Sequence, residues 1–302
     1  MIKEIIEDLS SNNINISKYK RTPKKSGQKE VYFITVSDKE YVLKIINVTP
    51  YAIYNEFDDD DPELQKAVEQ GVLYLSQRTI LEIEMSKKCN ILPQMKLMEQ
   101  LKLLKVEDEY YLYYIEEKFD GSSLKYSDNY TLEQVNEFIL QLVEQIIIMH
   151  KEHYVHRDIK PDNIIYNSTN NKYSLIDGGI CKNTDEDYKL TVIDKPLGTP
   201  RYMAPEQVRV SPNEKWNFQT DLFPLGLIAI EMFVPELRTQ SNEDLRDLHY
   251  ALKKWQEHSK NDSEIQYFKK VIVNLSQATR ALRFNNLEKL RDELLKWKEE
   301  LK

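Results

Sequence analysis

A short segment, from His156 to Asn163, carries the side chains for one kind of chemistry. It holds two carboxylates, an amide, a histidine and two cations. Phosphoryl transfer uses such a set, because an acid must accept a hydroxyl proton, an amide oxygen must hold a metal ion and a cation must lie near the phosphate. Asp158, Asn163 and Lys160 are of these three types. The alternative interpretation is a charged turn that joins a helix to a strand.

Two further motifs follow this segment in the chain. An apolar run, Tyr173 to Ile176, precedes Asp177-Gly178-Gly179, and residues 198–206 read Gly-Thr-Pro-Arg-Tyr-Met-Ala-Pro-Glu. In this order the motifs resemble the catalytic loop, the metal-binding Asp-Phe-Gly and the Ala-Pro-Glu segment of eukaryotic-type serine/threonine protein kinases. The resemblance covers roughly residues 18–300 and rests on the order of several motifs, since any one alone would be weak.

The resemblance implies an α+β fold with two lobes. A small, β-rich N-lobe with one main helix would take about residues 18–118, and a larger, mostly helical C-lobe about residues 119–302. Residues 1–17 would form an N-terminal extension. A length of 302 residues suits such a pair of lobes and leaves little for another domain.

The resemblance also implies catalytic roles in the C-lobe. Asp158 would be the base that orients the attacking hydroxyl, and Lys160 would steady the transferring phosphate. Thr199 would bond to both through its hydroxyl, as the matching threonine does in the family. Lys160 followed by proline, together with Thr199, indicates a serine/threonine rather than a tyrosine kinase.

Asn163 and Asp177 match the metal-binding positions of the family. Both supply hard oxygen ligands, which suit Mg²⁺ because this ion takes a few protein oxygens together with substrate phosphates. A turn asparagine and a loop aspartate are the structural alternative.

In the N-lobe, Lys44 lies within a β-rich run and matches the strand lysine that pairs with the α- and β-phosphates of the nucleotide. Burying an unpaired charge is costly, so a buried lysine needs a carboxylate partner. Glu82 falls at the matching position of the next helix, and Glu84 is the alternative.

The nucleotide loop before this strand departs from the family pattern. Residues 24–30 hold one glycine, Gly27, where glycines normally let backbone N–H groups approach phosphates. Residues 116–121 resemble the hinge between the lobes, and the backbone near Glu117 would hold the adenine edge, with the register open by one residue. The residues expected to form an apolar slot around adenine are Val31, Val42, Ile165 and Ile176.

Local patterns predict several elements. A capping box at Thr131 to Gln134 begins a helix with apolar residues at helical spacing. We expect a helix over residues 2–9, hairpins over 31–46 and 101–119, a solvated acidic insertion at 58–62 and an amphipathic helix over 286–297.

Further residues match structural positions of the family. Glu206 would pair with Arg283, with Arg280 as the alternative, and Asp221 would anchor the catalytic loop from a central helix. Asp194 is a candidate partner of Arg157 in the activation segment.

Two departures from the family concern the apolar stack that links the lobes. Gly178 replaces a phenylalanine, and Ser86 replaces an apolar residue. We therefore hypothesise that a substrate or regulatory partner assembles the active arrangement.

Composition narrows the classes of protein. The formal net charge of −8 argues against a general nucleic-acid binder, which would show a basic face. Two cysteines, Cys89 and Cys181, lack metal-ligand spacing and suit a reducing compartment.

The chain shows no apolar run of about 20 residues for a membrane span, and its acidic N-terminus is unlike a signal peptide. We expect a soluble, cytoplasmic protein, with secretion by a signal-free route left open.

The expected function is ATP- and Mg²⁺-dependent phosphorylation of serine or threonine hydroxyls on a protein substrate. The main alternative is a pseudokinase, a binding module that holds nucleotide poorly and signals by its shape. A small-molecule kinase is a third reading, and residues 198–206 argue against it because they match the peptide-docking platform of protein kinases.

Overall fold

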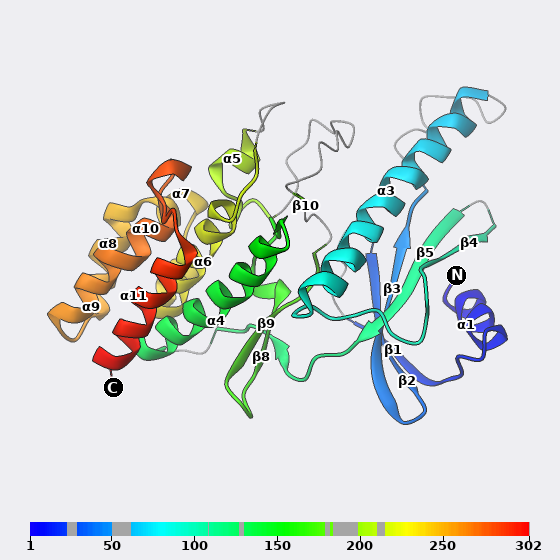
Figure 1. Cartoon of the computed structure of the whole chain (residues 1–302), viewed down its shortest axis with the longest axis horizontal. Helices are drawn as coiled ribbons and strands as arrows, with labels where there is room; N and C mark the ends of the chain where they lie inside the picture. The colour runs from blue at the N-terminus through cyan, green and yellow to red at the C-terminus, as the bar shows by residue number, and fades with distance from the viewer. Residues whose placement is uncertain are drawn as a thin grey trace. The chain divides into compact units, whose positions relative to one another are not determined.

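The computed structural model describes residues 1–22, 29–49, 62–107, 109–126, 130–178, 182–183, 199–209 and 215–301, with side chains undescribed at 62–75 and 182–183. Contacts divide the chain into two compact units, Met1–Phe119 and Asp120–Lys302 (Figure 1). Gly27, Gly179, Cys181, Asp194 and the acidic insertion lie outside the described residues.

The first unit is a five-stranded antiparallel sheet with helices on both faces (Figure 1). The strand order is β1-β2-β3-β5-β4. The strands are β1 (Ile16–Arg21), β2 (Lys29–Val36), β3 (Lys39–Asn47), β4 (Lys102–Val106) and β5 (Glu109–Glu117), and the helices are α1 (Ile2–Ser11) and α3 (Pro62–Cys89).

Alternation along β3 and β5 separates two apolar clusters, because successive strand side chains point to opposite faces. Ile5 and Leu9 of α1 pack in one cluster with Leu43 and Ile45 of β3. Ile83 of α3 packs in the other cluster, which includes Ile46, Leu112 and Tyr114 of β3 and β5. The neighbouring position, Lys44, therefore faces α3 rather than α1.

The N-terminal strand β1 was not predicted from the sequence. It pairs with β2 from Ile16 opposite Val36 to Arg21 opposite Tyr32, so a boundary after residue 17 falls inside this strand. Five of its six positions are exposed. It therefore lacks the alternation of apolar and polar residues that signals a strand.

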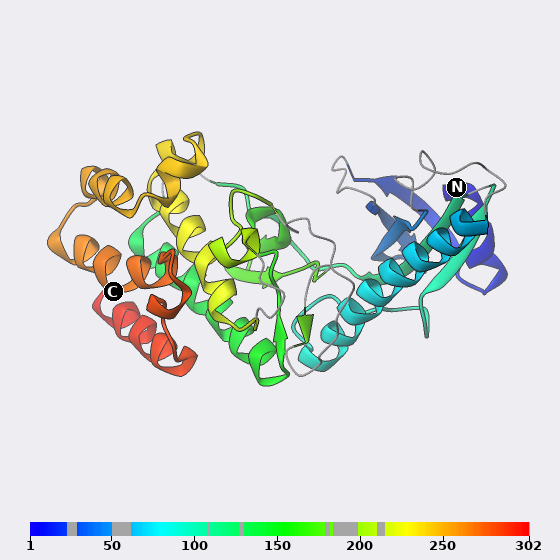
Figure 2. The same ribbon diagram turned by 90° about the horizontal axis from the view of Figure 1, so that it is seen from above.

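The second unit is mostly helical (Figure 2). Its α-helices are α4 (Leu132–Lys151), α5 (Pro205–Val208), α6 (Gln219–Phe233), α7 (Asn242–Arg246), α8 (Leu248–His258), α9 (Asp262–Tyr267), α10 (Val273–Ser276) and α11 (Leu287–Glu300). Short strands accompany them: β6 (Ser122–Ser123), β7 (Tyr154–Val155), β8 (Ile164–Asn167), β9 (Lys172–Leu175) and β10 (Lys182–Asn183). Single turns of other helix types span Pro161–Asn163, Pro235–Arg238, Phe268–Ile272 and Arg280–Leu282.

Helices α4 and α6 form the centre of this unit. The predicted capping box begins α4. The Thr131 hydroxyl oxygen accepts from the Gln134 backbone N–H, and the Gln134 side-chain oxygen accepts from the Thr131 backbone N–H. Every residue of α6 is buried. A Cβ on Gly226 of α6 would collide with the Ser276 hydroxyl of α10, so this glycine permits the close approach of the two helices.

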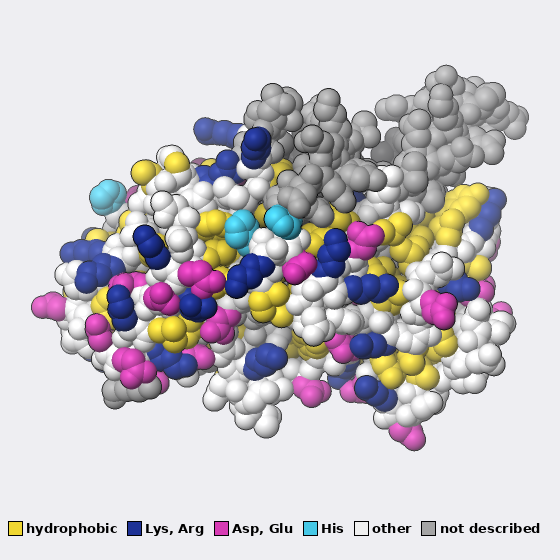
Figure 3. Space-filling model, in the orientation of Figure 1, with side chains coloured by type: hydrophobic (Ala, Val, Ile, Leu, Met, Phe, Trp, Pro, Cys, Tyr) yellow, Lys and Arg dark blue, Asp and Glu magenta, His cyan; other side chains and the backbone are white. Residues whose placement is uncertain are grey.

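The predicted α+β fold is confirmed: an N-terminal sheet with one long helix precedes a helical C-terminal part. Within the described residues, none of the helices is both long and apolar enough to cross a membrane. On the face drawn in Figure 3, basic and acidic side chains are interspersed over the coloured, described surface.

Candidate active site

Lys44 lies in a buried cluster of charged side chains in the first unit. Its Nζ is 2.9 Å from Glu82 Oε1 and 3.0 Å from Glu116 Oε2. The three residues are only 4%, 6% and 6% exposed. Tyr114 donates its hydroxyl to Glu82 at 3.1 Å, and the Lys29 ammonium approaches the other Glu82 oxygen at 3.3 Å.

Sheet register and one helix assemble this cluster. Lys44 of β3 stands opposite Tyr114 of β5, and Val42 opposite Glu116, so all four side chains share the face covered by α3. Helix α3 supplies Glu82, which is buried, whereas Glu84 is exposed. Of the two carboxylates that the sequence left open, Glu82 is therefore the partner of Lys44.

Glu116 is a second carboxylate at this lysine that the sequence analysis assigned only to the hinge. The pKa of Glu116 is raised to about 7, chiefly by burial; Lys44 opposes the shift and the negative charge of Glu82 adds to it. The alternation of Leu112, Tyr114 and Glu116 on one face of β5 is the sequence signal that could have located it.

The expected nucleotide-slot residues of this unit lie on the same face. Val31 pairs with Lys44, and Val42 lies two residues before Lys44 in β3, so both valines share its face. Glu117 points to the other face: its backbone N–H donates to the Gln94 carbonyl at 2.9 Å and its carboxylate accepts from the Gln94 N–H at 3.1 Å. The Glu117 side chain thus fixes the end of β5.

In the second unit, Asp158 is held by two neighbours in its own loop. The Lys160 ammonium donates to Asp158 Oδ2 at 2.7 Å. The Asn163 amide donates to the same carboxylate oxygen and to the Asp158 carbonyl, both at 2.9 Å. The three residue types selected from the sequence are therefore in direct contact.

Asp221 of α6 fixes this loop through the loop's backbone. Its carboxylate accepts from the backbone N–H groups of His156 at 2.9 Å and Arg157 at 2.8 Å. Asp221 is 1% exposed. Burial raises its pKa, while His156 and Arg157 oppose the shift. Arg157 has a φ of 67°, so the two N–H groups point to one carboxylate at the cost of a left-handed residue.

The β8–β9 hairpin brings Asn163 and Asp177 to one end. Ile164 pairs with Leu175, and the Ile176 N–H donates to the Asn163 carbonyl at 2.9 Å, directly before Asp177. Ile165 and Ile176 lie on the hairpin face that also carries Asn163, because they alternate with the paired Ile164 and Leu175. Both isoleucines are partly exposed.

These two residues fit a magnesium ion by the chemistry of their donors. The Asn163 amide nitrogen is turned to Asp158, which leaves its side-chain oxygen without a hydrogen-bond donor among the described residues. No group of three or more His, Cys, Asp or Glu side chains in that part of the chain could form a closed metal cage. An amide oxygen and one carboxylate suit Mg²⁺, which keeps waters and phosphate oxygens as its other ligands.

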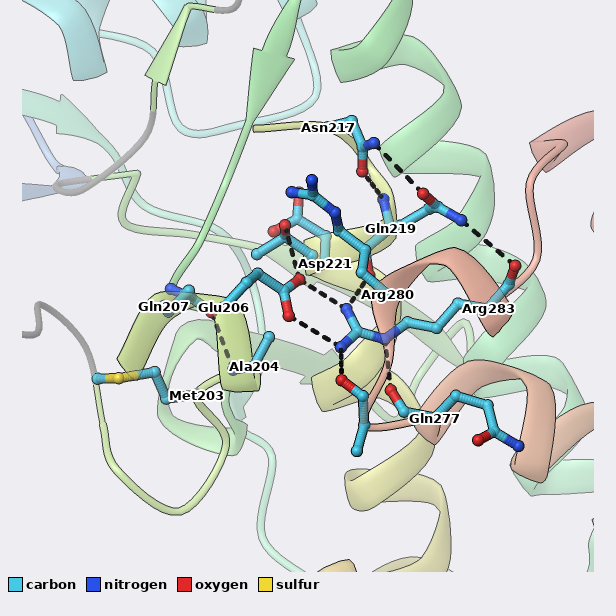
Figure 4. A network of polar contacts seen from close by, with 12 residues as sticks. Met203, Ala204, Glu206, Gln207, Asn217, Gln219, Asp221, Gln277, Arg280 and Arg283 are labelled. Atoms are coloured by element: carbon cyan, nitrogen blue, oxygen red, sulfur yellow. Dashed lines mark hydrogen bonds and ion pairs between the residues drawn. The ribbon is translucent and has the colours of Figure 1, made fainter. Parts of the chain in front are cut away.

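A buried ion pair fixes the segment that ends at Glu206 (Figure 4). Arg283 donates to both Glu206 oxygens, at 2.7 and 2.9 Å, and its side chain is fully buried. Arg280, the alternative partner, donates instead to the Lys215 carbonyl. Gln207 next to Glu206 donates to the Arg157 carbonyl at 2.7 Å, which links this segment to the catalytic loop.

Two arginines to which the sequence assigned no role, Arg201 and Arg246, fix residues 200–203. Arg201 pairs with the buried Glu231 at 2.6 Å and donates to the Leu237 carbonyl. Arg246 donates to the Pro200 and Met203 carbonyls at 2.6 and 2.8 Å. The sequence analysis missed both, because backbone carbonyls that accept from a distant arginine leave no pattern in the sequence.

Comparison with known proteins adds the family. A model of the protein kinase domain matches residues 63–298, which is more than half of the chain. The chain belongs to the protein kinase domain family. This confirms the resemblance that the three motifs indicated.

The curated relatives of this kinase domain are distant. Serine/threonine-protein kinase D of Synechocystis sp. is 31% identical over 187 residues, which are 60% of this chain and 35% of that protein. Serine/threonine-protein kinase C of the same organism is 39% identical over 107 residues, 34% of this chain and 19% of that protein. Human Citron Rho-interacting kinase is 34% identical over 134 residues, 42% of this chain and 6% of that protein. The matched part thus spans about a third or less of these relatives' lengths.

The two departures from the kinase pattern have different surroundings. Ser86 is buried and donates its hydroxyl to the Leu92 and Pro93 carbonyls, so it ties the end of α3 to the following loop. Gly178 is buried beside Asp177. The Lys44–Glu82 pair forms by contacts within the first unit. The hypothesis that a substrate or regulatory partner assembles the active arrangement also concerns Asp177, and it stays a prediction.

Thr199 keeps a backbone role in the described residues. Its carbonyl accepts from the N–H groups of Tyr202 and Met203 at 3.0 and 3.2 Å. It lines a cavity together with Lys160. The expected bonds from its hydroxyl to Asp158 and Lys160 are not among the contacts of the described residues.

Proposed function

We propose that this kinase domain is an active serine/threonine protein kinase that uses ATP and Mg²⁺. The observation that carries the proposal is the contact set of Asp158, which binds Lys160 and Asn163 in a loop fixed by Asp221. A purely structural loop would not need a carboxylate that accepts hydrogen bonds from both an ammonium and an amide.

In the proposed reaction, Asp158 accepts the proton of a substrate hydroxyl while the hydroxyl oxygen bonds to the γ-phosphorus of ATP. The bond from that phosphorus to the bridging oxygen breaks, and ADP leaves with the electron pair. Lys160 lies 2.7 Å from Asp158, so its ammonium can balance negative charge on the transferring group. The Thr199 hydroxyl is proposed to join these two when a substrate is bound.

Asn163 and Asp177 are the proposed magnesium ligands. The ion, when bound, would neutralise charge on the nucleotide phosphates. The Asn163 amide also donates to Asp158, so this residue is proposed to position the base as well as to bind the metal ion.

Lys44 is proposed to contact the α- and β-phosphates, with Glu82 holding its ammonium in place. In the first unit, Val31, Val42, the backbone next to Glu117 and the segment with Gly27 are proposed to contact the nucleotide. In the second unit, Ile165 and Ile176 are the proposed adenine contacts.

The choice of serine and threonine rests on two supports. Lys160 and Pro161 follow the base, which is the serine/threonine pattern of the family. Two of the relatives named above, both from Synechocystis sp., carry serine/threonine in their names.

The test is transfer of the γ-phosphate from ATP with Mg²⁺ to a mixed protein substrate and to the domain itself. We expect phosphoserine or phosphothreonine from the wild type, and about 10²–10⁴ less from Asp158→Asn, because the base is lost. Asp292→Asn, on the exposed face of α11, is the matched control and should keep wild-type transfer. Equal transfer by Asp158→Asn and wild type would refute the assignment.

A pseudokinase is the second candidate, and Gly178 favours it. A glycine in place of phenylalanine gives the Asp177 segment more backbone freedom and less apolar contact. Binding of ATP without transfer to any substrate would support this candidate over the enzyme.

A further inference from the structure

A cavity of about 500 Å³ lies within the second unit, beside the catalytic loop. Lys160, Pro161 and Asp162 line one side of it, and Thr199 and Tyr202 another. Since Lys160 also binds Asp158, a chain that presents a hydroxyl to Asp158 would place neighbouring residues in this cavity.

The cavity carries more cations than carboxylates. Of the described residues that line it, Lys125, Lys160 and Arg238 are cations and Asp162 alone is a carboxylate. Asp158 already neutralises Lys160. Lys125 is exposed, and within the described residues neither Lys125 nor Arg238 forms an ion pair with a carboxylate.

Arg238 is fixed by hydrogen bonds to backbone carbonyls, which do not neutralise its positive charge. It donates only to backbone carbonyls in the part of the chain that the structure describes, those of Glu231 at 2.7 Å and Met232 at 3.2 Å. Its guanidinium lies 4.7 Å from the centre of the Tyr126 ring. A fixed, half-buried guanidinium binds an incoming carboxylate with little loss of side-chain freedom.

The side chain of Glu231, whose backbone carbonyl accepts from Arg238, already has other partners. Glu231 is buried, and its side chain accepts from Arg201 and from the hydroxyls of Tyr202 and Tyr126. Arg201 therefore compensates the charge of Glu231, and the positive charge of Arg238 stays available at the surface of the cavity.

We propose that this cavity binds an acidic side chain of the protein substrate, close to the serine or threonine that is phosphorylated. The proposal rests on the proposed function, because it places the substrate hydroxyl at Asp158. Arg238 receives the carboxylate and Lys125 adds long-range attraction, while a basic residue at the same position would be repelled.

The test uses a serine peptide in which a single Asp or a single Lys is moved through about three positions on each side of the serine, since an extended residue spans roughly 3.3–3.6 Å. The ratio of kcat/KM for the Asp and Lys peptides is measured at each position. For the wild type we expect kcat/KM to be at least about fivefold to tenfold higher for the Asp peptide than for the Lys peptide at one or more positions. This ratio should fall as the salt concentration rises.

Two variants test the named cations. The Lys125→Gln, Arg238→Gln protein should phosphorylate both peptides alike, because it loses the attraction for the Asp peptide and no longer repels the Lys peptide. Lys253→Gln removes an exposed lysine of α8 outside the cavity and should keep the wild-type preference. Arg238→Lys retains the charge without the planar fork and should keep part of the preference, which guards against a folding defect in the glutamine variant.

Peptides with alanine in place of serine, followed by fluorescence anisotropy, separate this proposal from the proposed function. Tighter binding of the Asp peptide that Arg238→Gln abolishes supports the cavity even if no phosphate is transferred. Active transfer with no Asp preference, or with the same preference in the double variant, would overturn the cavity and leave the enzyme standing. Loss of both transfer and charge-dependent binding would refute both.

Discussion

At the residue scale, the unusual feature is that Lys44 has two buried carboxylate partners. Glu82 and Glu116 both lie within about one hydrogen-bond length of its ammonium, and Lys29 reaches the far oxygen of Glu82. A buried carboxylate is tolerated only with such partners, because desolvation disfavours the charged form. Glu116 therefore titrates closer to neutral pH than an exposed glutamate.

The pKa of Glu116 gives a pH dependence to stability. Its pKa rises from 4.5 to about 7 in the fold, so the folded chain binds more protons than the unfolded chain between these values. The contribution of Glu116 to the free energy of unfolding is thus greatest below about pH 4.5 and declines as the pH rises to about 7.

Urea unfolding at a series of pH values tests this expectation. Glu116→Gln should remove that decline, so the difference in stability between wild type and variant changes across this pH window. Two curves that stay parallel from acidic to neutral pH would contradict the assignment.

Replacing Glu82 should lower turnover without releasing Lys44. Because Glu116 still binds the ammonium, Glu82→Gln should reduce kcat/KM by about 10-fold to 100-fold, as expected for a mispositioned group. The Glu82→Gln, Glu116→Gln protein should lose more than either single variant. Steady-state kinetics with Glu84→Gln as the exposed control checks this, and an equal loss in that control would argue against a specific role.

At the scale of elements, buried contacts fix the segments that carry the site. Arg283 and Glu206 join the segment after Thr199 to the turn before α11, and Asp221 of α6 fixes the catalytic loop. Breaking a fully buried pair leaves one charge without compensation, whereas an exposed pair is screened by water.

Arg283→Met should therefore destabilise the second unit by about 3–5 kcal/mol, because Glu206 would remain buried without its partner. Lys254→Met removes the solvent-screened pair with Glu257 on α8 and should change stability far less. Chemical denaturation of both variants compares the two losses directly. Similar values for both would show that the Glu206–Arg283 pair is not desolvated.

The close approach of α6 and α10 gives a second stability prediction. Gly226→Ala should cost about 1–3 kcal/mol through overpacking against Ser276. The Ser276 hydroxyl is buried and has no hydrogen-bond partner among the described residues, so Ser276→Ala should be nearly neutral and should recover part of the loss in the double variant. Full additivity of the two changes would contradict the contact.

At the scale of the whole molecule, each unit organises its own share of the proposed chemistry. The first unit assembles the Lys44 cluster from β3, β5 and α3, and the second assembles Asp158, Lys160 and Asn163 in one loop. Each set is formed by contacts within its unit, so each can be tested separately.

The order of the motifs predicted the family, the α+β class and the pairs Lys44–Glu82 and Glu206–Arg283, because these residues stand in local patterns with a fixed chemistry. It did not predict the hydrogen bonds that Asp158 accepts from Lys160 and Asn163. It missed β1, whose side chains are mostly exposed. It also missed the pairing of Glu116 with Lys44 and the arginine contacts to residues 200–203, since these depend on register and on distant backbone carbonyls.

The most direct measurement of the central claim compares ATP binding with phosphoryl transfer in Asp158→Asn. Calorimetric titration with MgATP should give an affinity within about threefold of wild type, because Asp158 acts on the hydroxyl, while transfer falls by about 10²–10⁴. Lys44→Met should instead weaken nucleotide binding. If Asp158→Asn transferred phosphate at the wild-type rate, Asp158 would not be the catalytic base and the account would be wrong.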